Sequence, residues 1–229
     1  MPCGPAIEKG KQVEKMKRAA LLLTILVVAL LLAPHRIEAG PRAPVIVALG
    51  DSLTAGLGLP QDQAFPAQLE AALRARGHDV TVVNAGVSGD TASAALARLD
   101  WALPEDASAV IVELGGNDAL QGVRPAGTKQ ALANIIEELQ VKGLPVLLAG
   151  MEAPRNMGKD YVEEFRAIYA DLAAQYDVVF YPFFLEGAAL TDGMMQGDGI
   201  HPSAKGIAAI VENILPKVEE LLARANAAH

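Results

Sequence analysis

Two short segments, one near each end of the chain, contain the residue types of a nucleophilic hydrolysis site. Ser52 lies in a Gly-Asp-Ser-Leu sequence directly after an apolar run, and Asp198 and His201 lie together in Asp-Gly-Ile-His-Pro. A serine hydroxyl becomes a nucleophile when a histidine takes its proton and a carboxylate orients that histidine. The short separation lets the carboxylate of Asp198 fold back to the ring of His201. The sequence therefore predicts a triad of Ser52, His201 and Asp198.

Two further motifs, each after an apolar run, could supply hydrogen bonds to an oxyanion. Residues 84–91 (NAGVSGDT) include two glycines, which allow a backbone N–H to approach a substrate closely. Residues 115–118 (GGND) include Asn117, whose amide can donate to an oxyanion, as a carboxylate cannot. We expect the acids Asp51 and Asp118 to be structural. Each motif alone is common in ordinary turns, but their order along the chain favours one site.

These motifs need a scaffold that brings them together. Near-continuous apolar runs, typical of strands buried on both faces, occur at residues 45–49, 80–83, 109–114, 145–149 and 178–180. Helical periodicity occurs at residues 64–76, 129–141, 161–175 and 203–222, with Thr128 and Ser203 as candidate N-caps. Strands that alternate with helices predict a parallel, doubly wound α/β sheet. In such sheets, binding sites lie beyond the carboxyl ends of the strands.

The N-terminal segment predicts export. Residues 19–33 form an uncharged apolar run after a basic flank, which is typical of a secretory signal peptide. The run is shorter than the about 18–20 residues that a membrane-spanning helix needs. We expect cleavage near Ala39, so that residues 1–39 are an N-terminal extension with a signal peptide. Residues 40–229 would then form one hydrolase domain in the periplasm or outside the cell. An uncleaved anchor is the alternative.

Composition limits the chemistry and the partners of this domain. The only cysteine, Cys3, precedes the apolar run, so residues 40–229 have no thiol for a disulfide, a nucleophile or a metal site. That range contains 13 basic and 24 acidic residues, a formal charge of −11, which repels nucleic acid and anionic lipid. We expect His78 and His229 to be inert, since neither follows a strand. We therefore expect a small-molecule substrate and no metal, cofactor or nucleic-acid partner, with membrane contact only through an uncleaved signal segment.

Together the motifs resemble the GDSL, or SGNH, hydrolase family, and in particular its exported branch of acyl-thioesterase/lysophospholipases and arylesterases. The resemblance runs through GDSLTAGLGLP (50–60), FPAQL (65–69), NAGVSGDT (84–91), ELGGND (113–118), MEAPRNMG (151–158), FRAIYADLA (165–173), YPFF (181–184) and DGIHP (198–202). It implies a flavodoxin-like three-layer α/β/α sandwich with a five-stranded parallel sheet.

The resemblance also implies a role for each residue of the site. Ser52 corresponds to the nucleophile, and Asp198 and His201 correspond to the rest of the triad. The oxyanion hole comprises the backbone N–H groups of Ser52 and Gly89 and the side-chain amide of Asn117. The family pattern requires no cofactor and no metal.

The expected activity is that of a serine esterase that hydrolyses aryl and acyl esters through an acyl-enzyme, with thioesters and lysophospholipids as further substrates. An apolar lining beside the triad is predicted from Leu57, Leu59 and the loop 187–196, which contains Leu190, Met194 and Met195. The alternatives are a carbohydrate or lipid deacetylase and a non-catalytic ligand-binding relative. A flavodoxin-like cofactor binder is disfavoured, because the turn after the first strand has an acid and no lysine where a phosphate would lie.

Overall fold

The computed structural model describes residues 13–18 and 43–228. The chain divides into two units, residues 1–42 and 43–229. Residues 13–18 form a short helix with an ion pair of 3.1 Å between Glu14 and Arg18. The predicted signal run and its cleavage site lie outside the described residues. Among the helices that the structure describes, none is both long and apolar enough to cross a membrane.

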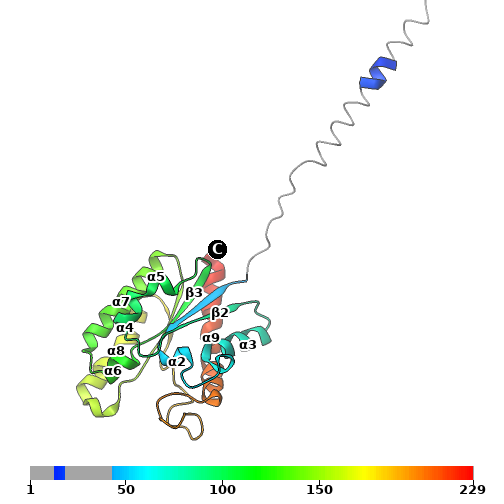
Figure 1. The fold of residues 1–229 in the computed structure, drawn as a ribbon. Coiled ribbons are helices and arrows are strands. Elements are labelled where there is room, and N and C mark those ends of the chain that lie inside the picture. Colours follow the sequence, from blue (N-terminus) through cyan, green and yellow to red (C-terminus); the bar gives the residue numbers. More distant parts are fainter. Residues whose placement is uncertain (1–12, 19–42, 229) are drawn as a thin grey trace, which may run out of the picture. The chain divides into compact units, whose positions relative to one another are not determined.

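The domain is built around a five-stranded sheet (Figure 1). Its strands are β1 (Val45–Gly50), β2 (Thr81–Gly86), β3 (Ala107–Glu113), β4 (Val146–Ala149) and β5 (Val179–Tyr181). They lie in the order β2-β1-β3-β4-β5, and every neighbouring pair is parallel. The chain therefore starts inside the sheet, adds β2 on one side, and returns to add the other three strands on the opposite side. This topology confirms the predicted doubly wound α/β fold.

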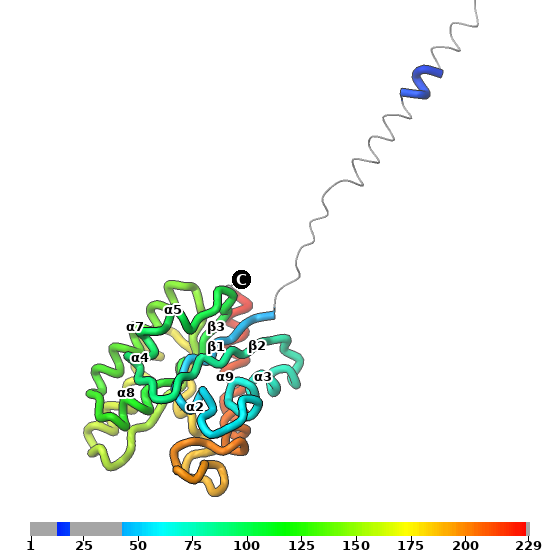
Figure 2. The backbone as a smooth tube through the Cα atoms, in the orientation of Figure 1, coloured from blue at the N-terminus to red at the C-terminus, as the bar shows by residue number. Residues whose placement is uncertain are grey.

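Helices cover both faces of the sheet and complete the predicted three-layer sandwich (Figures 1 and 2). On one face α3 (Phe65–Ala75) packs against α9 (Ala204–Ala228). The other face carries α4 (Ala92–Ala97), α5 (Leu99–Ala102), α7 (Pro125–Val141) and α8 (Lys159–Tyr176). Shorter helices and turns follow strand ends or lie in loops, namely α2 (Ser52–Ala55), η1 (Gln61–Gln63), α6 (Gly116–Leu120) and η2 (Arg155–Met157).

The register of three neighbouring strands brings their carboxyl ends to the same level. Gly50 at the end of β1 pairs with Gly86 at the end of β2 and with Glu113 at the end of β3. The segments that follow these residues are the three motifs predicted to contain the nucleophile and the oxyanion donors. They therefore leave the sheet side by side at one edge, as the general rule for such sheets requires.

Helix α7 begins at Pro125, before its predicted start, and the side chain of Thr128 makes a tertiary contact instead of capping the helix. Thr128, a predicted N-cap, lies inside α7, where it is buried and donates its hydroxyl to Asp118 Oδ1 at 3.1 Å. The other predicted cap is confirmed. The Oγ atom of Ser203 accepts the N–H of Gly206 at 3.2 Å, at the first turn of α9.

A tyrosine of α8 supports the turn after β3. Tyr169 is buried, and its hydroxyl donates to the carbonyl of Leu114 at 3.0 Å. The next residue, Gly115, has a φ of 110°, in the region that favours glycine. A Cβ atom at Gly115 would lie 2.2 Å from the Tyr169 hydroxyl oxygen. The turn that leads to Asn117 therefore needs a glycine for both its conformation and its space.

Gly115→Ala should lower the free energy of unfolding by about 2–4 kcal/mol, because left-handed strain of about 1–2 kcal/mol adds to a clash with a buried hydroxyl. Gly143→Ala is the matched control, since Gly143 has a φ of 75° but a Cβ there would meet no atom within 4 Å. Denaturant unfolding of the two variants measures the difference. Equal losses would contradict the importance of the contact with Tyr169.

Candidate active site

Ser52 stands in the first turn after β1. Asp51 caps α2, and its Oδ1 accepts the N–H of Leu53 at 2.9 Å. Gly50 is needed because a Cβ atom there would lie 2.1 Å from Thr54 Oγ1. At the start of this short helix, the N–H of Ser52 has no acceptor within the helix. The Gly-Asp-Ser sequence therefore folds into a tight turn that leaves a hydroxyl and a backbone donor side by side.

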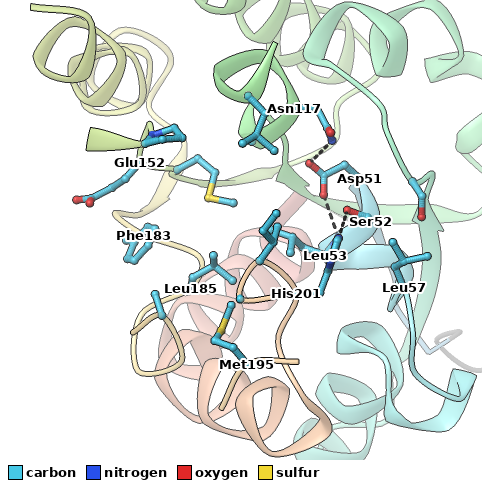
Figure 3. Close-up of a pocket in the computed structure, with 18 of the residues that line it drawn as sticks. Asp51, Ser52, Leu53, Leu57, Asn117, Glu152, Phe183, Leu185, Met195 and His201 are labelled. Atoms are coloured by element: carbon cyan, nitrogen blue, oxygen red, sulfur yellow. Dashed lines mark hydrogen bonds between the residues drawn. The ribbon is translucent and has the colours of Figure 1, made fainter. Parts of the chain in front are cut away.

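The side chains of Ser52, His201 and Asp198 form a series of hydrogen bonds. His201 Nε2 lies 2.9 Å from Ser52 Oγ, and His201 Nδ1 lies 2.7 Å from Asp198 Oδ2. Figure 3 shows His201 directed at Ser52 on one side of a pocket. The fold thus brings the two predicted motifs within hydrogen-bonding range across 149 residues of sequence.

A compact turn keeps Asp198 ionised. Its Oδ1 accepts the backbone N–H groups of Ile200 at 2.9 Å and of His201 at 3.0 Å. Gly199, between Asp198 and Ile200, has a φ of 68°, which a glycine adopts without strain. The hydrogen bonds from the His201 backbone, the His201 ring and Ile200 hold the pKa of Asp198 well below its usual range. Asp198 is therefore a charged carboxylate at neutral pH and can accept a hydrogen bond from the imidazole of His201.

Gln196 joins the loop that contains His201 to the segment that follows Ser52. Its Nε2 donates to the carbonyl of Leu57 at 2.8 Å and to that of Pro202 at 3.0 Å. Its backbone N–H donates to the carbonyl of His201 at 2.7 Å. Gln196 is not predicted from the sequence, because a single glutamine in a polar loop carries no local signal.

Gly89 lies in a tight turn after β2. The N–H of Asp90 donates to the carbonyl of Val87 at 3.1 Å, which closes this turn. Gly89 is its third residue and has a φ of 91°, the sign that a type II turn requires at that position. A Cβ atom at Gly89 would meet nothing within 4 Å. The glycine is therefore required for backbone conformation rather than for space.

The side chain of Asn117 is held by two acceptors. Its Nδ2 donates to Asp51 Oδ2 at 3.0 Å, as Figure 3 shows, and to the carbonyl of Asp90 at 3.1 Å. An amide nitrogen has two hydrogens, so both are engaged by the protein. A further acceptor at this amide must share or replace one of these bonds.

Two buried carboxyl groups lie next to the turn that contains Ser52. Burial raises the pKa of Asp51 to about 6, although hydrogen bonds from Leu53 and Asn117 act to lower it. Burial and then the charge of Asp51 raise the pKa of Glu113 well above its usual range. Glu113 Oε2 accepts the hydroxyl of Thr54 at 2.7 Å. Burial therefore favours the neutral form of Glu113, and the amide of Asn117 faces the carboxyl group of Asp51.

Ser52 and His201 face an apolar pocket of about 410 Å³. Ser52, Gly89, Asn117 and His201 all line it. The rest of its surface is mainly aliphatic, aromatic or thioether, from Leu57, Leu120, Met151, Pro154, Phe183, Leu185, Leu190, Met195 and Ile200. The predicted lining is confirmed for Leu57, Leu190 and Met195. It is wrong for Leu59 and Met194, which pack against the hydrophobic core instead.

Residues expected to be structural or inert lie outside the hydrogen-bonded series. Asp118 Oδ2 accepts the N–H of Ala92 at 2.8 Å and so joins α4 to α6. His78 Nε2 lies 3.2 Å from Glu219 of α9. His229 falls outside the described residues. Within residues 13–18 and 43–228, no group of three or more histidine, cysteine, aspartate or glutamate side chains is placed to hold a metal ion.

The family model and the sequences of known proteins indicate the same family for this chain. Residues 48–209, more than half of the chain, match the model of the GDSL-like lipase/acylhydrolase family. Esterase TesA of Pseudomonas aeruginosa is 43% identical over 181 residues, which cover 79% of this chain and 90% of that protein. Thioesterase 1/protease 1/lysophospholipase L1 of Escherichia coli K12 is 41% identical over 162 residues, which cover 70% of this chain and 76% of that protein.

A solved structure similar to this chain is also that of an esterase. The crystal structure of AlinE4, an SGNH-hydrolase family esterase, is 45% identical and has a TM-score of 0.67. The match covers 80% of this chain and 98% of that one.

Glu113→Gln should change how stability depends on pH. Between the usual pKa of 4.5 and the raised native value, the native state keeps the proton of Glu113 and the unfolded state releases it. The contribution of Glu113 to the free energy of unfolding is therefore full below pH 4.5 and decreases as the pH rises. Relative to Glu113→Gln, the unchanged protein should lose stability as the pH rises above 4.5. Urea unfolding at a series of pH values above 4.5 measures this, and parallel curves would show that Glu113 is not buried as a neutral acid.

Proposed function

The chain belongs to the GDSL-like lipase/acylhydrolase family and is a hydrolase of carboxylic esters, and we propose that it works by acyl transfer to Ser52. The observation that carries this proposal is the series of hydrogen bonds from Asp198 through His201 to Ser52, at 2.7 Å and 2.9 Å. A hydroxyl becomes nucleophilic when an imidazole accepts its proton and a carboxylate holds that imidazole in the required tautomer.

In the first step Ser52 Oγ attacks the carbonyl carbon of the ester while His201 Nε2 takes the hydroxyl proton. Asp198 accepts the hydrogen on Nδ1, so that Nε2 is the basic nitrogen and the imidazolium that forms is stabilised. The new C–O bond displaces the carbonyl electron pair onto its oxygen. The product of this step is a tetrahedral oxyanion bonded to Ser52.

We assign three donors to that oxyanion: the backbone N–H groups of Ser52 and Gly89 and the amide of Asn117. All three residues line the same pocket, which supports the assignment. The amide hydrogen that Asp51 accepts in the unliganded site is the one that Asn117 would share with the oxyanion. The oxyanion and the carboxylate of Asp51 would then compete for this hydrogen of Asn117.

The tetrahedral adduct collapses when His201 gives its proton to the leaving oxygen. Ser52 is then acylated, and the alcohol or phenol departs. A water molecule repeats the sequence, with His201 as base and the same donors around the second oxyanion, and the carboxylic acid is released. Apart from the ester and the water molecule, the groups that act in these steps all belong to this chain.

The lining of the pocket favours apolar acyl or aryl groups. Its walls are formed by aliphatic, aromatic and methionine side chains, and methionine adapts its shape to different ligands. We propose aryl and simple acyl esters as the first class of substrate, with thioesters and lysophospholipids as further substrates. A sugar would leave its hydroxyl groups without partners along much of this surface, so the lining disfavours a carbohydrate deacetylase.

Ser52→Ala should reduce the turnover of p-nitrophenyl acetate by about 10⁴–10⁶-fold, because the nucleophile is lost. It should also abolish labelling by a fluorophosphonate probe. Ser93→Ala, at an exposed position of α4, is the matched control and should keep both properties. Comparable turnover by Ser52→Ala, with the fold intact by circular dichroism, would exclude Ser52 as the nucleophile.

We also propose that residues 1–39 direct export and are removed, which leaves residues 40–229 in the periplasm or outside the cell. When the full chain is expressed in a Gram-negative host, N-terminal sequencing of the periplasmic protein should begin near Gly40. Recovery of the protein in the membrane fraction with its first residues intact would support the uncleaved anchor instead.

A further inference from the structure

Arg98, at the junction of α4 and α5, contacts three segments around the proposed oxyanion hole. Its Nε donates to Asp90 Oδ2 at 2.6 Å. Its Nη2 donates to the carbonyl of Ala85 at 2.9 Å and to that of Gly50 at 3.2 Å. The side chain is only 23% exposed, and that of Asp90 only 13%. This is a partly buried junction rather than a solvated surface ion pair.

Each acceptor of this guanidinium belongs to a segment that carries a proposed donor. The carbonyl of Gly50 is on the strand end that leads directly to Ser52. The carbonyl of Ala85 is near the end of β2, before the turn that contains Gly89. Asp90 is the last residue of that turn.

The same contacts extend to the third donor. The carboxylate of Asp90 is held by Arg98, and the carbonyl of Asp90 accepts an amide hydrogen of Asn117 at 3.1 Å. Asn117 lies on α6, after a different strand. A single guanidinium therefore connects, directly or through one residue, the segments of Ser52, Gly89 and Asn117.

We propose that Arg98 is a positioning residue for the oxyanion hole, an inference that rests on the proposed function. Donors stabilise an oxyanion only when they converge at about 2.7–3.1 Å on the place where it forms. They come here from three separate turns, so their spacing depends on what holds those turns together. The planar guanidinium donates in several directions at once, which the point charge of a lysine cannot reproduce.

The test compares Arg98→Lys and Arg98→Gln with Arg224→Lys in the full chain. Arg224 is the matched control, because it also donates to a backbone carbonyl, that of Asp177 at 2.6 Å, and to a carboxylate, that of Glu220 at 3.2 Å. The measurements are kcat and KM for p-nitrophenyl acetate, the melting temperature, and the inhibition constant of phenylboronic acid. The boronate forms a tetrahedral adduct with a reactive serine and so reports on the oxyanion hole separately from substrate binding.

Both Arg98 variants should lower kcat by about 10–100-fold with little change in KM, because displaced donors weaken transition-state binding. The inhibition constant of phenylboronic acid should rise by a similar factor, and millimolar methylguanidine should restore part of the kcat of Arg98→Gln. Arg224→Lys should leave all three kinetic quantities unchanged. A folded Arg98→Lys or Arg98→Gln with unchanged kcat, or with reduced kcat but unchanged boronate affinity, would overturn the proposal.

If the Arg98 variants do not fold, Asp90→Asn decides the question. This change removes the charge that Arg98 holds but keeps the carbonyl that orients Asn117. A parallel loss of kcat and boronate affinity supports the proposal, and unchanged values overturn it. The result for Ser52→Ala separates the two levels of inference. An active Ser52→Ala removes the proposed function, whereas an inactive Ser52→Ala beside fully active Arg98 variants removes only the role of Arg98.

Discussion

The site depends on the register of three parallel strands. Gly50, Gly86 and Glu113 end β1, β2 and β3 at one level, so the backbone leaves the sheet three times within a small area. Each exit is a tight turn that needs a glycine, for space at Gly50, for backbone conformation at Gly89 and for both at Gly115. The interior of the sheet supports these exits, because β1 and β3 are almost fully buried. Burial of that apolar surface is the main source of stability in such a domain.

Part of this stability is offset by polar groups that the domain buries at the same edge. Asp51 and Glu113 are each almost inaccessible to solvent, and their carboxyl groups are close enough for the charge of Asp51 to raise the pKa of Glu113. Hydrogen bonds from Leu53, Asn117 and Thr54 satisfy most of their oxygens. Buried polar groups that reduce stability are typical of functional sites, where orientation matters more than unfolding free energy.

Much of this arrangement could be predicted from the sequence, because its signals are local. Apolar runs identify the strands, and the motifs that follow them contain Ser52, Gly89 and Asn117. The separation between Asp198 and His201 predicts their hydrogen bond. Arg98, Gln196 and the contact from Thr128 to Asp118 could not be predicted, because each joins segments that meet only in the folded chain. The short helices α4, α5 and α6 contain too few residues to show a clear period.

The two sides of the pocket have different structural origins. Ser52, Gly89 and Asn117 come from turns anchored in the sheet, whereas Asp198 and His201 come from a loop outside it that is held by Gln196 and by the capped start of α9. That loop also contributes Met195 and Ile200 to the pocket wall. Sequence drift within the loop can therefore alter which substrates fit while the three sheet-anchored turns stay unchanged. The loop with Asp198 and His201 and the three turns of the proposed oxyanion hole are thus open to separate evolutionary adjustment.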